Sequence, residues 1–175
     1  MSDAPYETLS ERVDQFHIRV SGTYPEAMNC GAGCSSCCHQ HLSVVPLEWE
    51  RIRRAVESLP AATRDRISTR VKAGRADARC PLLGDDDRGQ GFEARPMSCR
   101  SHGLPIQVGE PPVRDVCPLN FTEGPAIEDL ESDLLLDVER VNQMRGLMCT
   151  LEGHDATARV DLIEGLSELL SSPGE

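Results

Sequence analysis

The chain has 175 residues, a length that fits one domain with a modest core. Aromatic residues make up only 3% of it and hydrophobic residues 39%, so the core is expected to be aliphatic and thin. The net charge of −11 would repel phosphates, which argues against a nucleic-acid partner. We therefore predict a single domain over residues 1–175, with a small core that a bound metal would help to stabilise.

The sequence predicts a cytoplasmic protein that does not enter a membrane. The N-terminal stretch lacks the basic and apolar regions of a signal peptide, and no apolar run approaches the ~18 residues of a membrane span. In the reducing cytoplasm, clustered cysteines indicate metal binding or catalysis more than disulfides.

The first predicted element is a helix from Pro5 to about Val20, in which apolar residues recur at helical spacing. Thr8 and Glu11 have the spacing of a capping box near its start. A turn-rich connection over residues 21–29 then leads into a segment rich in cysteine.

That segment reads Cys30-Gly-Ala-Gly-Cys34-Ser-Ser-Cys37-Cys38-His39-Gln40-His41, and it holds four of the eight cysteines of the chain. Its small residues allow the backbone to curl tightly and bring several sulfur atoms to one point. It has almost no apolar bulk to bury, so a metal ion or an iron–sulfur cluster is expected to take the place of a local core.

Two further helices are predicted after the cysteine segment. A short β-branched run over residues 42–45 precedes Pro46, which suits the first turn of a helix that continues to residue 59. Its apolar residues lie on one face, and Glu48 is expected on the polar remainder. Residues 61–79 are predicted to form the second helix of an antiparallel hairpin.

Residues 80–125 contain seven prolines and six glycines in 46 positions and show no sustained periodicity, so an irregular loop is expected. Beyond it, an apolar stripe from Ile127 to Met148 predicts a long helix, and residues 155–171 predict a last one. The predicted fold is mainly α, with about five helices around an irregular cysteine-rich centre and little or no β structure. The cysteine core would occupy about residues 28–120 and a C-terminal helical pair about residues 126–171.

Three more cysteines, Cys80, Cys99 and Cys117, are spread along the loop at nearly even intervals. A loop of that length is uncommon in a compact domain unless something holds it, so we interpret these cysteines as points that tie it to the first cluster. The eighth, Cys149, lies on the apolar side of a predicted helix and is expected to be an ordinary buried residue.

Thiolates favour zinc, iron–sulfur clusters and cuprous copper over hard cations. A structural zinc site commonly uses two close cysteine pairs, whereas this sequence has one C-x-x-C, between Cys34 and Cys37. The dispersed single cysteines favour an iron–sulfur cluster, and zinc remains the alternative. Arg95 and Arg100, on either side of Cys99, are expected to offset the negative charge of such a centre.

The ordered motifs Cys30-x3-Cys34-x2-Cys37-Cys38, Cys80-Pro-Leu-Leu, Arg95-Pro-x-x-Cys99-Arg100 and Cys117 resemble the YkgJ-type cysteine-cluster family, also called CxxCxxCC proteins. The resemblance implies metal chelation by the seven matching cysteines: Cys30, Cys34, Cys37, Cys38, Cys80, Cys99 and Cys117. The family also has a cysteine and a tyrosine before the Arg-Pro pair, where this chain has Gly89 and Phe92, so one ligand of the family pattern is missing.

Three hypotheses follow. The first is a metal-binding protein that uses its centre for redox chemistry, metal handling or structural support. The second is a protein-modifying enzyme, because flagellin lysine methylases carry a related cluster; a pocket lined by His39, His41 or Arg100 would favour it. The third is a structural zinc adaptor that contacts a protein partner through acidic helices.

Overall fold

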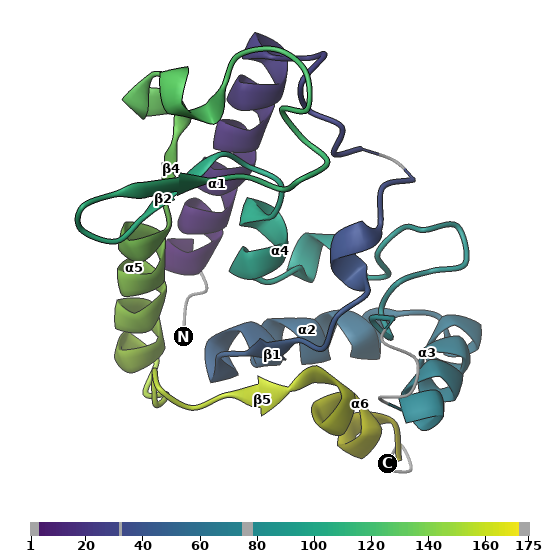
Figure 1. Ribbon diagram of the computed structural model, residues 1–175. Coiled ribbons are helices and arrows are strands. Elements are labelled where there is room, and N and C mark those ends of the chain that lie inside the picture. The colour runs from purple at the N-terminus through teal and green to yellow at the C-terminus, as the bar shows by residue number, and fades with distance from the viewer. Residues whose placement is uncertain (1–3, 32, 75–78, 172–175) are drawn as a thin grey trace. The chain divides into compact units, whose positions relative to one another are not determined.

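The computed structural model describes residues 4–31, 33–74 and 79–171 (Figure 1). The chain forms two compact units, each assembled from two separate stretches of sequence. The first unit combines Met1–Cys34 with Met97–Met148, and the second combines Ser35–Pro96 with Cys149–Glu175. The boundary at Cys34 falls inside the cysteine segment. That residues 1–175 act as one domain stays a prediction.

Helix α1 (Ala4–Thr23) is the longest element of the first unit, and it confirms the predicted first helix. Leu9, Val13 and Val20 are buried along one face, as their spacing predicts. The predicted capping box is wrong, because the helix begins at least four residues before Thr8 and this residue lies inside it.

The loop predicted over residues 80–125 contains regular structure in the first unit. Met97–Ser101 form a short helix, α4, and Ile106–Val108 (β2) pair antiparallel with Val113–Asp115 (β3). On its other side, β2 pairs in parallel with β4 (Leu136–Asp137). The strands are only two or three residues long, too short for alternation of apolar and polar residues to reveal them in the sequence.

The long helix predicted from Ile127 is correct only in its second half. Residues 127–137 form two single turns, η4 (Ile127–Asp129) and η5 (Ser132–Leu134), and then strand β4, before α5 (Val138–Leu151) begins. The Arg114 guanidinium donates hydrogen bonds to the carbonyls of Ile127, Glu128 and Leu130. A continuous helix would use those carbonyls internally, so the contact with Arg114 stabilises the separate turns instead.

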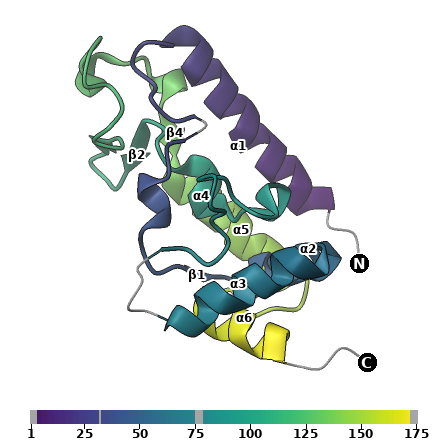
Figure 2. The same ribbon diagram turned by 90° about the vertical axis from the view of Figure 1, so that its right-hand side faces the viewer.

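In the second unit, α2 (Pro46–Ser58), α3 (Ala61–Ala73) and α6 (Leu162–Ser171) surround one aliphatic core. Helix α6 packs against both α2 and α3 (Figures 1 and 2). Strand β1 (Ser43–Val44) pairs antiparallel with β5 (Val160–Asp161), and Phe92–Ala94 form a short turn, η3. The core residues are Val44, Ile52, Val56, Ile67, Val71, Leu162 and Leu166. This core confirms the aliphatic character predicted from composition.

Three details of the second unit differ from the sequence prediction. Helix α3 ends at Ala73 because Gly74 turns the chain with a φ of 69°, and Ala78, predicted inside it, lies outside the described residues. Glu48 is buried, and its carboxylate accepts a hydrogen bond from the Val45 N–H at the start of α2.

The last helix begins at Leu162 rather than at residue 155, because Val160 and Asp161 pair with β1. Six α-helices therefore occur in the described ranges, one more than predicted, the short α4 being the addition.

Asp161 is the residue that starts α6. Its Oδ1 accepts hydrogen bonds from the backbone N–H groups of Ile163 at 3.0 Å and Glu164 at 3.1 Å. Replacing Asp161 with alanine leaves these donors without that partner, and we expect the free energy of unfolding to fall by about 0.5–2 kcal/mol. Urea denaturation measures the loss, and Asp161→Asn, which keeps an acceptor at the cap, is the matched control. Equal losses in both variants would contradict a capping role.

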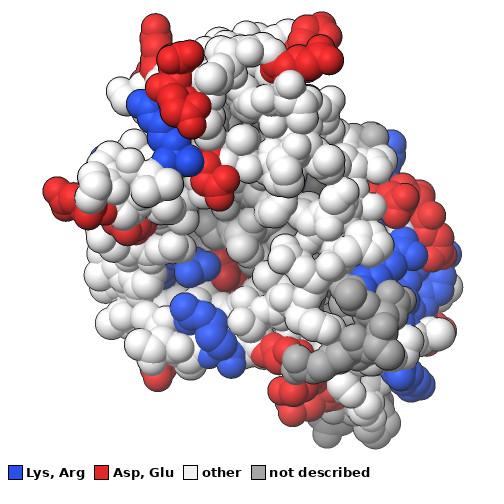
Figure 3. Space-filling model, viewed as in Figure 1, with Lys and Arg blue, Asp and Glu red and all other residues white. Residues whose placement is uncertain are grey.

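None of the helices in the described ranges combines the length and apolar character that crossing a membrane requires. On the face shown in Figure 3, acidic and basic side chains lie next to each other in several small groups among uncharged residues. The excess of negative charge is thus spread over several elements rather than concentrated in one place on that face.

Candidate metal centre

The two units divide the seven predicted metal ligands between them. The first unit holds Cys30, Cys34, Cys99 and Cys117, and the second holds Cys37, Cys38 and Cys80. Cys99 is exposed and the other six are partly buried. All seven are free thiols, as expected for cysteines that serve as metal ligands rather than in disulfides.

Cys37 and Cys38 lie on a single turn, η1 (Ser36–Cys38), which the small residues before it allow. The turn is closed by the Cys38 N–H, which donates to the Ser35 carbonyl at 2.8 Å. The Cys80 N–H in turn donates to the Cys38 carbonyl at 2.7 Å. The backbone therefore brings Cys80 from the long loop beside the double cysteine. That the Cys80 thiol ties the loop to the first cluster as a metal ligand stays a prediction.

Neighbouring thiols and burial raise the pKa values of Cys37 and Cys80. A hydrogen bond with Cys38, followed by burial and the charge of Cys38, raises the pKa of the Cys37 thiol. Burial raises the pKa of Cys80, and the charge of Cys37 adds to this, while the backbone of Leu82 and Leu83 acts in the opposite direction. Deprotonating several of these thiols together is unfavourable without a nearby positive charge, and a bound cation supplies one.

In the first unit, Asn120 holds Cys30 in place. Asn120 is buried, with 2% of its surface exposed, and its Nδ2 lies 3.2 Å from the Cys30 Sγ and 2.7 Å from the Gly103 carbonyl oxygen. Its Oδ1 accepts the Asn29 N–H at 2.8 Å. Gly103 has a φ of +89°, and a Cβ at this position would come within 2.3 Å of the Cys30 Sγ. A glycine is therefore required where the chain passes this thiol.

The chain segments on either side of this contact are bound to each other. The Asn120 N–H donates to the Cys117 carbonyl at 2.8 Å, and the Phe121 N–H donates to the Ala27 carbonyl at 2.7 Å. The rings of Tyr24 and Phe121 meet edge to face, with centroids 5.5 Å apart. The segment carrying Cys117 thus lies along the segment that leads to Cys30, and backbone groups and asparagine side chains hold it there.

The surroundings of Cys99 differ from the prediction. Cys99 lies on α4 with an exposed side chain, and the neighbouring Arg100 is 6% exposed and forms an ion pair with Asp14 of α1. The α1 carboxylate thus already offsets the Arg100 charge that was expected to face the metal centre. This pair attaches α4, and with it Cys99, to the first helix.

The histidines play smaller parts. His39 and His41 are exposed, and His41 lines a small cavity in the second unit together with Cys80. His102 and Cys117 line a larger cavity in the first unit. Of the residues expected to line the pocket of an enzyme, His41 lines the smaller of these two cavities, and His39 and Arg100 line neither of the two.

In the described ranges, no three His, Cys, Asp or Glu side chains are arranged as a complete metal site. The donor set nevertheless suits a soft metal. Three cysteines lie close together in the second unit, Cys37, Cys38 and Cys80. All three are partly buried thiols outside any disulfide, and thiols are ligands that soft metals prefer.

A family model described as "Putative zinc- or iron-chelating domain", CxxCxxCC, matches residues 29–117, about half of the chain. The chain belongs to this family. No curated protein and no solved structure matches it. The matched CxxCxxCC region includes all seven predicted ligands and excludes Cys149, which is fully buried as predicted.

The CxxCxxCC region ends three residues before Asn120. Asn120 contacts the Cys30 sulfur, and the sequence did not predict this contact. Its only sequence signal is the short stretch Cys117-Pro-Leu-Asn120, which does not by itself indicate a partner 90 positions away.

Proposed function

We propose that this chain binds an iron–sulfur cluster through the cysteine thiolates of its CxxCxxCC region, for redox chemistry, metal handling or structural support, in the reducing environment of the cytoplasm. The observation that carries the proposal is the backbone-paired grouping of Cys37, Cys38 and Cys80 within the matched region. Thiolates are the usual ligands of iron–sulfur clusters, and such a cluster would supply one-electron transfer when bound.

The proposed ligands are the seven cysteines that match the family pattern, and the residues around them have supporting roles. Asn120 donates a hydrogen bond to the Cys30 sulfur, and contacts of this kind orient ligands and tune the metal. Gly89, at the position of the missing family cysteine, forms an isolated backbone bridge with Leu83 and so contributes to the loop that begins at Cys80.

A protein-modifying enzyme is the second candidate, because a cavity of about 540 Å³ in the first unit is lined by Cys117, one of the proposed ligands. Enzyme sites typically occupy cavities of this size. Methyl transfer would need a bound methyl donor. The cavity supports a small-molecule site and does not point to one particular reaction.

Metal analysis and a visible absorption spectrum of protein purified without oxygen test the proposal. We expect a brown protein with several irons per chain and broad absorption near ~400 nm. A colourless protein with one zinc per chain would contradict the iron–sulfur proposal and support a structural zinc adaptor. Protein free of both metals after reconstitution with iron and sulfide, or with zinc, would contradict chelation altogether.

A further inference from the structure

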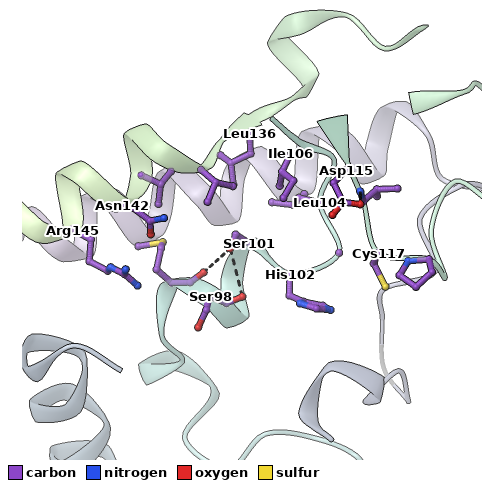
Figure 4. Close-up of a pocket in the computed structure, with 16 residues that line it drawn as sticks. Ser98, Ser101, His102, Leu104, Ile106, Asp115, Cys117, Leu136, Asn142 and Arg145 are labelled. Carbon is purple, nitrogen blue, oxygen red and sulfur yellow. Dashed lines mark hydrogen bonds between the residues drawn. The ribbon is translucent and has the colours of Figure 1, made fainter. Parts of the chain in front are cut away.

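A cavity lies wholly within the first unit, between α4, the β2–β3 hairpin and the start of α5. Its volume is about 540 Å³, within the range of small-molecule sites. Figure 4 shows Arg145 and Asn142 toward one end of it and Asp115 and Cys117 toward the other. Apolar side chains of Leu104, Ile106 and Leu136 lie between these ends, opposite Ser98 and Ser101 of α4.

The two ends differ in charge. Arg145 and Asn142, from consecutive turns of α5, form one end, and His102, Cys117 and Asp115 form the other (Figure 4). A guanidinium beside an amide suits a carboxylate, because both donate hydrogen bonds to oxygen. The Asp115 carboxylate at the far end would repel a second negative charge, which disfavours polyphosphates and dicarboxylates.

The wall between the ends is mainly aliphatic. Ser98 and Ser101 of α4 also belong to it, and its large apolar residues are Met97, Leu104, Ile106, Leu136, Val138 and Val141. Among the described residues, the lining contains no Phe, Tyr or Trp that could stack on a nucleobase or another aromatic ring. The hydroxyl of Ser101 donates to the Met97 carbonyl of its own helix at 3.0 Å, so it adds little polarity to this wall.

We infer that this cavity binds an aliphatic monocarboxylate of medium chain length, with the carboxylate at Arg145 and Asn142 and the hydrocarbon chain along the apolar wall. The inference goes beyond the proposed function, with which it shares Cys117, a proposed metal ligand that also lines the cavity.

Titration of the full chain with octanoate, followed by calorimetry, tests the inference. We expect a dissociation constant on the order of 0.1–1 mM for octanoate. Acetate, which lacks the chain, should show no measurable binding, and octylamine, which reverses the charge, should bind at least about tenfold more weakly. Equal binding of octanoate and octylamine, or no binding of octanoate, would overturn the inference.

The variant Arg145→Gln should weaken octanoate binding at least about tenfold, because it removes the charge-assisted contact. Arg140→Gln is the matched control, since Arg140 is an exposed residue of the same helix that does not line the cavity. It should change the affinity less than about twofold. Equal effects of both substitutions would show that only overall charge matters and would overturn the inference.

Thermal unfolding of both arginine variants shows whether they remain folded. If Arg145→Gln fails to fold, Asn142→Ala tests the same end of the cavity through an exposed side chain. It should weaken octanoate binding several-fold, as expected for loss of a neutral hydrogen bond. Wild-type affinity in this variant would place octanoate elsewhere and overturn the inference.

Discussion

Asn120→Ala should lower both the stability of the protein and its affinity for metal. The side chain binds the Cys30 sulfur, the Gly103 carbonyl and the Asn29 N–H, and the substitution removes all three contacts. Because Gly103 is buried, its carbonyl would lose a partner that water cannot readily replace. We expect the free energy of unfolding to fall by about 1–3 kcal/mol and the metal affinity to fall about 10–100-fold.

Urea denaturation and competition with a chelator measure the two effects. Asn29→Ser is the matched control, because it removes the exposed Asn29 side-chain contact with the Leu119 carbonyl and keeps the backbone N–H that Asn120 accepts. Asn120→Asp keeps the acceptor for Asn29 but loses the donor to the Cys30 sulfur and to the Gly103 carbonyl, and it buries a carboxylate beside both, so it should also lower stability and metal affinity. Wild-type metal affinity in both Asn120 variants would show that the hydrogen bond to Cys30 has no effect on the centre.

The helices that the sequence predicted well are those whose packing follows from local periodicity. Helix α1 buries Leu9, Val13 and Val20 on one stripe, and Pro46 begins α2 at the first position of the helix. Such patterns are visible within a few turns of sequence, because the period of a helix decides which residues share a face. The burial of Cys149 followed from the same argument.

The errors occur where distant contacts or competing caps decide the structure. Arg114 donates hydrogen bonds to backbone carbonyls within residues 127–130. The apolar stripe had predicted that these residues belong to a long helix. Asp155 was a plausible start for α6, but its carboxylate binds the N–H and hydroxyl of Thr157 in a local turn. Asp161, followed by Glu164 at the spacing of a capping box, was the stronger signal and caps the helix.

The candidate site shows the same division. Cysteine spacing selected the residues proposed as metal ligands, because thiols in a segment without apolar bulk have few other roles. It could not identify Asn120 or the requirement for glycine at position 103, since both depend on where two remote segments cross beside Cys30. Nor could it show that the buried Arg100 pairs with Asp14 of another helix.

The substitutions Cys38→Ser and Cys80→Ser should each reduce the metal affinity by at least about tenfold, because a hydroxyl is a much poorer ligand for a soft metal than a thiolate. Both cysteines belong to the backbone-paired group of the second unit. Metal content after dialysis against a chelator, with near-ultraviolet and visible absorption, measures the loss. Unchanged metal content in both variants would exclude the two thiols as ligands.

Cys149→Ala supplies the matched control, because Cys149 is a fully buried cysteine outside the CxxCxxCC region. It should cost about 1–2 kcal/mol of stability through lost packing and leave the metal content unchanged. The variants are therefore expected to separate in two measurements, with metal lost from Cys38→Ser and Cys80→Ser and stability alone lost from Cys149→Ala. If the Cys149 variant lost metal as readily as the other two, metal loss would report a general weakening of the fold rather than removal of a ligand.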